Sequence, residues 1–169
     1  MRRWPLVRDA IAWDRTISRR WRESGRGRAR RWAVLGAHVG DGWIWVLALA
    51  LFLFSDGARP LAWRWAIAMP LAGGITTGLK FLWRRQRPAQ MAGFHSVTYD
   101  RHSFPSGHAT RMGTVVVFMP LLVPRWGWFS LLLALWVGWS RVALGVHYLL
   151  DVLVGMALGI VISLVILVA

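Results

Sequence analysis

Two histidines and a carboxylate stand out as groups that could act together on a phosphate. His147 and Asp151 are four residues apart at the expected start of a helix, so their side chains share one face. A carboxylate that bonds one imidazole nitrogen fixes the ring tautomer and leaves the lone pair on the other nitrogen for attack. His108 is a second imidazole, available as a general acid. These residues indicate phosphoryl transfer through a histidine.

Several cations near the same segments could bind the phosphate oxygens. Lys80, Arg87 and Arg141 can surround a tetrahedral dianion. The backbone N–H groups of Ser106 and Gly107 lie at the start of an expected helix, and the N-terminus of a helix is a favourable binding site for anions. Each group also has a structural interpretation: a basic flank of a membrane span, a helix cap, or an Arg141–Asp151 ion pair. Clustering of ionisable groups on one face of a membrane protein favours the functional interpretation.

The composition indicates a membrane protein. Hydrophobic residues make up 56% of the 169-residue chain, and 13 residues are Trp. Of the 21 basic residues, 11 lie within residues 1–31, before the first long apolar run. Basic residues that flank apolar spans orient a protein in the membrane and bind anionic lipid headgroups. The net charge of +14 therefore does not indicate a nucleic-acid partner. The chain has no cysteine, which excludes disulfides and thiolate metal sites.

The hydropathy pattern predicts an all-α bundle of about five spans. Residues 1–31 form a basic segment whose residues 4–23 we expect as an amphipathic helix lying on the membrane, with a solvated basic arm as the alternative. Its charges leave no apolar core for a signal peptide. Residues 32–169 form the transmembrane domain, with expected spans at 32–54, 61–83, 105–123, 126–142 and 148–169.

The connectivity of five spans brings the polar groups together. The ends of the second and fourth spans and the starts of the third and fifth must lie on one face of the membrane. That face carries Lys80, Arg87, Ser106, His108, Arg141, His147 and Asp151. Basic residues before the first span predict that this face, with the N-terminus, is cytoplasmic.

Three motifs give these residues a recognisable order. Lys80 is followed after six residues by Arg87-Pro88, then come Pro105-Ser106-Gly107-His108, and last Ser140-Arg141 with His147 and Asp151. This arrangement resembles the type 2 phosphatidic acid phosphatase superfamily, which also includes vanadium haloperoxidases. The short length and the Gly40–Trp43 stretch are similar to small bacterial members of the undecaprenyl-diphosphate phosphatase type.

The resemblance implies a role for each matched residue. His147 would form a phosphohistidine, Asp151 would hold its ring, and His108 would protonate the leaving oxygen and later activate water. Lys80, Arg87, Ser106, Gly107 and Arg141 would bind the phosphate, and no metal or cofactor is needed. Outside the motifs, Asp41 could position substrate or pair with a motif cation. Four arginines could bind a second phosphate or another part of the headgroup, namely Arg84, Arg85, Arg101 and Arg111.

The predicted function is therefore a membrane lipid phosphatase of the bacterial inner (plasma) membrane. Its substrate would be a lipid phosphate or a polyprenyl diphosphate such as undecaprenyl diphosphate, and its partners are membrane lipids. A phosphotransferase with the same site and a non-catalytic lipid-binding scaffold remain as alternatives. The sequence leaves the oligomeric state open.

Overall fold

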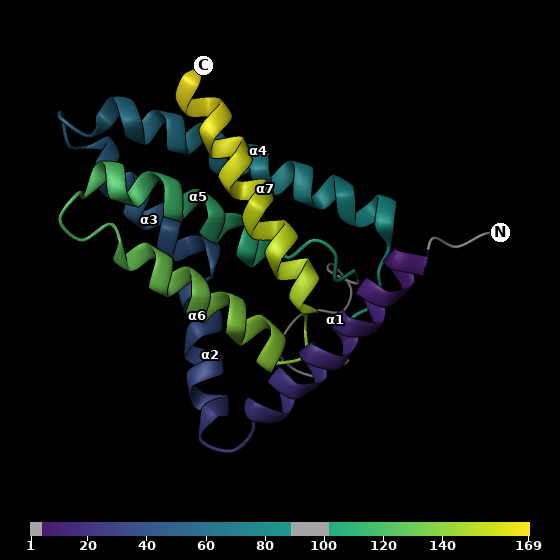
Figure 1. Cartoon of the computed structure of the whole chain (residues 1–169). Helices are drawn as coiled ribbons and strands as arrows, with labels where there is room; N and C mark the ends of the chain where they lie inside the picture. Colours follow the sequence, from purple (N-terminus) through teal and green to yellow (C-terminus); the bar gives the residue numbers. More distant parts are fainter. Residues whose placement is uncertain (1–4, 89–101) are drawn as a thin grey trace.

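The computed structural model describes residues 5–88 and 102–169, and these residues form an all-helical bundle as predicted (Figure 1). The described helices are α1 (Pro5–Ser24), α2 (Ala29–Val39), α3 (Gly42–Leu53), α4 (Arg59–Trp83), α5 (Gly107–Leu122), α6 (Phe129–Ala143) and α7 (Leu149–Val168).

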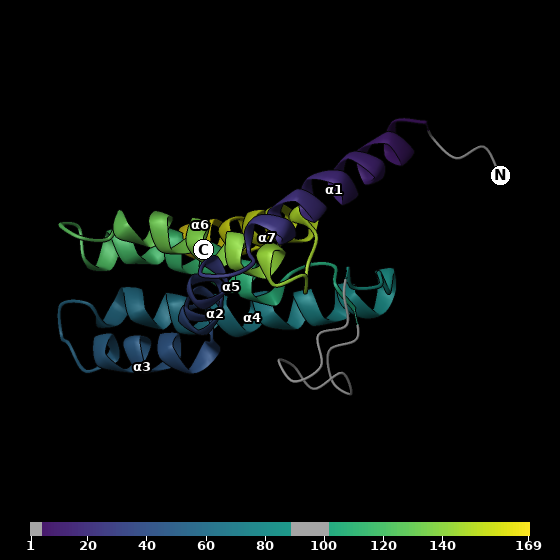
Figure 2. The same ribbon diagram turned by 90° about the horizontal axis from the view of Figure 1, so that it is seen from below.

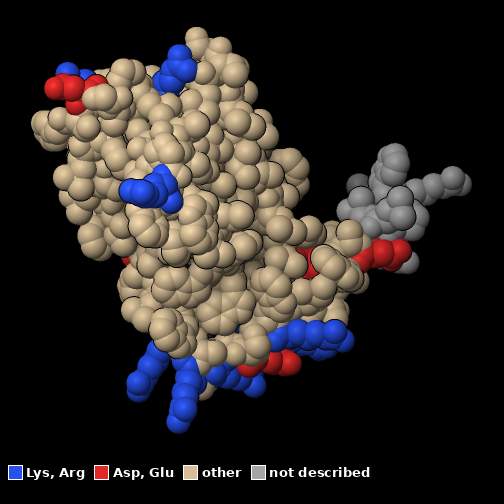
Figure 3. All heavy atoms as spheres, turned by 60° about the vertical axis from the view of Figure 1, so that its left-hand side comes forward, with Lys and Arg blue, Asp and Glu red and all other residues tan. Residues whose placement is uncertain are grey.

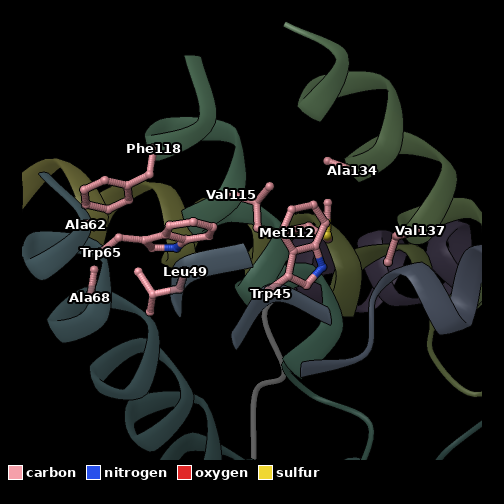
Figure 4. Close-up of a cluster of buried hydrophobic side chains, with 10 residues drawn as sticks. All are labelled: Trp45, Leu49, Ala62, Trp65, Ala68, Met112, Val115, Phe118, Ala134 and Val137. Atoms are coloured by element: carbon pink, nitrogen blue, oxygen red, sulfur yellow. The ribbon is translucent and has the colours of Figure 1, made fainter. Parts of the chain in front are cut away.

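The bundle has two layers, with α5 and α6 in one and α3 and α4 in the other (Figure 2). Large side chains fill the space between the layers, and Figure 4 shows Trp65 between Phe118 and Leu49. The rings of Trp65 and Phe118 stack with centroids 6.1 Å apart. Trp65 is fully buried, and its Nε1–H donates to Thr114 Oγ1 at 3.1 Å, so its polar atom is satisfied inside the core.

Close packing of α5 against α7 fixes the two helix starts that carry the site. A Cβ atom at Gly155 of α7 would lie 2.5 Å from the carbonyl oxygen of Ser106, which a real side chain cannot do. Gly159, one turn later, meets the carbonyl of Thr110 in the same way. Glycine at these positions lets the helix backbones touch, a common device in membrane bundles. The Ser106 N–H then donates to the Asp151 carbonyl at 2.9 Å.

The first predicted span, over residues 32–54, consists of two helices in the structure. Helices α2 and α3 meet at an angle of 45°. The break lies at Gly40 and Asp41, where Asp41 adopts an extended conformation with φ −68° and ψ 142°. Trp45 Nε1–H donates to the Val39 carbonyl at 2.8 Å and satisfies an acceptor that the break exposes. The break turns the Asp41 side chain toward α5, as described below.

The surface of the bundle is that of a membrane protein. Large apolar side chains are exposed on both layers, as at Leu51 of α3 (74%) and Leu135 of α6 (61%). Lys and Arg gather along the lower edge in Figure 3, below a mostly uncharged face. Among the described helices, α7 alone is long and apolar enough to cross a bilayer, and α2 with α3 qualifies as one bent span. The number of five spans therefore stays a prediction.

Candidate active site

His147 is a buried imidazole with a defined hydrogen bond on one nitrogen. Its side chain is 1% exposed, and its Nδ1 lies 2.7 Å from the carbonyl oxygen of Ser103. Because a carbonyl can only accept, we assign the proton to Nδ1, which leaves the lone pair of the neutral ring on Nε2. Asp151 Oδ2 lies 3.7 Å from the same Nδ1, in ion-pair range. The ring is therefore oriented mainly by Ser103, whose carbonyl the sequence did not single out.

A tight turn between α6 and α7 holds His147 in this position. Gly145 has φ +72°, a left-handed conformation that glycine adopts without strain. The N–H groups of Val146 and His147 both donate to the Arg141 carbonyl at 3.2 Å. The turn thus joins Arg141, at the end of α6, to the histidine at the start of α7.

Asp151 is fully buried, and its carboxylate accepts hydrogen bonds from a backbone N–H group and from an arginine side chain. Its Oδ2 accepts the Tyr148 N–H at 2.8 Å, and its Oδ1 accepts Arg85 Nη1 at 2.6 Å. Arg85 also pairs with Asp14 of α1 at 2.6 Å. The basic run predicted that Arg85 binds a second phosphate, whereas in the structure its guanidinium joins two carboxylates. Asp14 was not predicted as a site residue, because it is one of three acidic residues in an arginine-rich helix and belongs to no recognisable pattern.

The predicted phosphate-binding residues lie at the ends of the elements that converge here. Arg141 is 1% exposed, and Arg87 donates from Nη1 to the Val146 carbonyl at 3.2 Å. Lys80 lies in the last turn of α4. Ser106 is the N-cap of α5, and its hydroxyl accepts the Ala109 N–H at 3.5 Å. Since the Ser106 N–H donates to Asp151, the N–H groups that α5 offers to an anion are those of its first turn, beginning at Gly107.

His108 lies in that first turn and contacts a carboxylate from the α2–α3 break. Its Nε2 is 3.2 Å from Asp41 Oδ1, and the ring is 15% exposed. Asp41 Oδ2 in turn lies 3.0 Å from Nδ1 of His38, whose side chain is 60% exposed. Asp41, which the sequence marked as a possible support of the site, therefore contacts a motif histidine.

The other three residues predicted outside the motifs have different surroundings. Arg111 donates from Nη1 to the Gly40 carbonyl at 2.6 Å and so ties α5 to the break before α3. Arg84 is exposed, and its Nε donates to the Phe81 carbonyl of its own helix at 3.0 Å. The structure does not bring Arg84 to the cluster. Arg101 lies outside the described residues.

An apolar groove of about 430 Å³ begins beside the start of α5. Gly107, Thr110 and Arg111 line its polar end. Side chains of α3 and α4 line the rest, namely Val46, Leu49, Ala66, Met69 and Pro70, with Gly42 and Gly73. The groove is therefore apolar along α3 and α4 and polar at the start of α5.

The described residues contain no group of three His, Asp or Glu side chains arranged to hold a metal ion. What they bring together is a buried imidazole with an assigned tautomer, a second imidazole beside a carboxylate, and cations at the adjacent helix ends. This set of groups can bind a phosphate, attack it and protonate a leaving oxygen.

Known proteins are similar to this chain in sequence and in fold. Residues 61–169 match the PAP2 superfamily. An undecaprenyl-diphosphatase of Sulfolobus acidocaldarius is 32% identical over 127 residues, which cover 71% of this chain and 60% of that protein. A lipid A 1-phosphatase of Rhizobium etli is 44% identical over 57 residues, which cover 34% of this chain and 25% of that protein. The chain thus spans less than two thirds of either relative.

A solved structure agrees with the arrangement of helices. The transmembrane PAP2-type phosphatidylglycerolphosphate phosphatase of Bacillus subtilis superposes with a TM-score of 0.78 at 21% identity, over 94% of this chain and 84% of that one. The family match covers more than half of the chain and includes all three motifs. This chain therefore belongs to the PAP2 superfamily.

Proposed function

We propose that this chain is a membrane lipid phosphatase that works through a phosphohistidine on His147. The observation that carries the proposal is the 2.7 Å contact between His147 Nδ1 and the Ser103 carbonyl. With the proton on Nδ1, the lone pair on Nε2 is the nucleophile. Relatives named as an undecaprenyl-diphosphatase and a lipid A 1-phosphatase support the same class of reaction.

In the first step, Nε2 of His147 attacks phosphorus and forms the N–P bond while the P–O bond to the leaving group breaks. His108 gives its proton to the leaving oxygen, which departs as a lipid alcohol or a lipid phosphate. Arg87, Arg141 and Lys80 balance the charge on the phosphoryl oxygens together with the first N–H groups of α5.

In the second step, a water molecule attacks the phosphorus of the phosphohistidine. His108, now neutral, takes a proton from this water, and the N–P bond breaks to return the electron pair to Nε2. Inorganic phosphate leaves, and both imidazoles recover their starting protonation states. The cycle uses groups of this chain alone.

The substrate we propose is a lipid phosphate or polyprenyl diphosphate whose tail lies in the apolar groove between α3 and α4. The groove supports this choice because it begins at Gly107 and is lined mainly by aliphatic side chains. A phosphotransferase with the same site would deliver the phosphoryl group to another alcohol in place of water. A non-catalytic scaffold would bind the lipid without turnover.

A release assay distinguishes these functions. Purified protein is incubated with undecaprenyl diphosphate, phosphatidic acid or phosphatidylglycerol phosphate in the presence of a chelator, and free phosphate is measured. We expect release from at least one lipid and none from the H147A variant. A phosphorylated acceptor would favour the transferase, and bound but unchanged lipid would favour the scaffold. Phosphate release by H147A at the rate of the unmodified protein would refute the mechanism.

We also propose that the catalytic face is cytoplasmic, because α1 is rich in arginine, precedes the first apolar run and contacts the site through the Asp14–Arg85 ion pair. The chain has no cysteine, so a single R28C substitution gives one reactive thiol in the turn between α1 and α2. A membrane-impermeant maleimide should label it in inverted vesicles and not in intact cells. The opposite labelling pattern would overturn the orientation.

A further inference from the structure

Asp14 is a fully buried carboxylate in a helix that is rich in arginine and largely exposed. On α1, Asp14 is 0% exposed, whereas Trp13 is 54% exposed. A buried charge is strongly unfavourable unless it is paired and hydrogen-bonded. The contacts of Asp14 therefore indicate which groups stabilise its buried charge.

Asp14 and Ser18, one turn apart on α1, satisfy the first N–H groups of α7. Asp14 Oδ1 accepts the Leu150 N–H at 2.9 Å, and Ser18 Oγ accepts the Leu149 N–H at 2.9 Å. Ser18 Oγ also donates to Asp14 Oδ1 at 3.4 Å. The first N–H groups of a helix have no partner within it, and side-chain oxygens normally supply one from the residue just before the helix. Here a different helix supplies them.

Arg85 connects Asp14 to the carboxylate beside His147. Its Nη2 bonds Asp14 Oδ2 and its Nη1 bonds Asp151 Oδ1, each at 2.6 Å. The guanidinium carbon lies 4.0 Å from the centre of the Tyr148 ring, which fixes the plane of the group. Arg85 is thus held between two buried carboxylates, and its position depends on both.

We infer that Asp14 is a positioning residue for the His147–Asp151 pair, acting through Arg85 and through the first turn of α7. The inference rests on the proposed function and extends it to α1, which lies outside the residues that match the family. Asp14 contacts neither histidine. It fixes where Arg85 and residues 149–150 lie, and these fix Asp151.

Without Asp14, the first turn of α7 loses an acceptor and Arg85 loses one of its two anchors. Asp151 Oδ2 is already 3.7 Å from His147 Nδ1, so a further displacement would remove its influence on the ring. Substrate binding depends on other residues, namely the cations and the apolar groove. The effect of losing Asp14 should therefore appear in kcat, with KM nearly unchanged.

The test compares D14N with E23Q, which removes an exposed carboxylate from the same helix. For D14N we expect kcat to fall about 10- to 100-fold, as is typical when a group supporting a catalytic residue is lost. KM should stay within about twofold, and E23Q should match the unmodified protein. Combining D14N with R85M should lower kcat little further than R85M alone, because Asp14 acts through Arg85. Additive effects of D14N and R85M, or an unchanged kcat in D14N, would overturn the inference.

A second readout separates this inference from the proposed function. The imidazole nitrogen resonances of His147, in 15N-histidine-labelled protein assigned with H147A, should move in D14N and stay fixed in E23Q. If the unmodified protein releases no phosphate, the proposed function fails while this spectrum still tests the positioning role. If D14N does not fold, S18A removes only the acceptor of the Leu149 N–H. S18A should shift the same resonances and lower kcat several-fold, and unchanged resonances would refute the positioning role.

Discussion

Asp41, which lies at the break between α2 and α3, has its Oδ1 3.2 Å from Nε2 of the motif histidine His108. A carboxylate next to an imidazole stabilises its protonated form and orients its ring. The break between α2 and α3 therefore has a chemical consequence, since a continuous helix would not present Asp41 in an extended conformation.

D41N should weaken protonation of the leaving group. We expect kcat to fall about 100-fold with a lipid monophosphate, whose alkoxide leaving group needs the proton. With p-nitrophenyl phosphate, whose leaving group departs unprotonated, the loss should be less than about tenfold. The comparison of the two substrates in one preparation makes the measurement independent of protein yield. Equal losses on both substrates would contradict this role for Asp41.

The phosphohistidine should be trappable on His147. Brief incubation with a lipid carrying 32P in the scissile phosphate, followed by alkaline denaturation, should leave label that is stable to base and lost in acid. H147A should carry none, because the nucleophile is absent. R84Q is the matched control, since Arg84 is exposed and donates to its own helix. Label on H147A equal to that on R84Q would exclude His147 as the nucleophile.

G155A should lower both stability and activity. The added Cβ would lie 2.5 Å from the Ser106 carbonyl oxygen, so α5 and α7 must move apart at the level of the site. Overpacking of this kind costs about 1–3 kcal/mol. Thermal unfolding in detergent should show a lower Tm, and G78A should not, because a Cβ there meets nothing within 4 Å. A Tm for G155A equal to that of G78A would show that the contact is not tight.

The sequence predicted most of the bundle and the motif residues because apolar runs and motif spacing are local features. It did not predict the division at Gly40 and Asp41, since the residues on both sides are apolar and a span of that length looks continuous. Ser103 was missed for another reason. Its contribution is a backbone carbonyl, which every residue possesses, so only the three-dimensional path of the chain brings it to His147.

Asp14 and Arg85 show a further reason why sequence patterns do not predict every contact near the site. Their pairing joins residues 71 positions apart, and neither lies at a motif position. The charge pattern favoured interpreting Arg85 as one more phosphate-binding cation, because it sits in a basic run. The partner that decides its role comes from α1, in a segment that composition alone describes as basic and amphipathic.

Filling the apolar groove should reduce binding of long lipids without affecting the chemistry. Gly73 lines the groove, and a Cβ there meets nothing within 4 Å, so G73L can extend into it. Gly74, the next residue, is equally open and does not line the groove, which makes G74L the matched control. We expect G73L to raise KM about tenfold for a polyprenyl diphosphate, and to leave kcat/KM for p-nitrophenyl phosphate within about twofold, since only the tail is displaced. If G73L and G74L have the same KM for the lipid, the tail lies elsewhere on the protein.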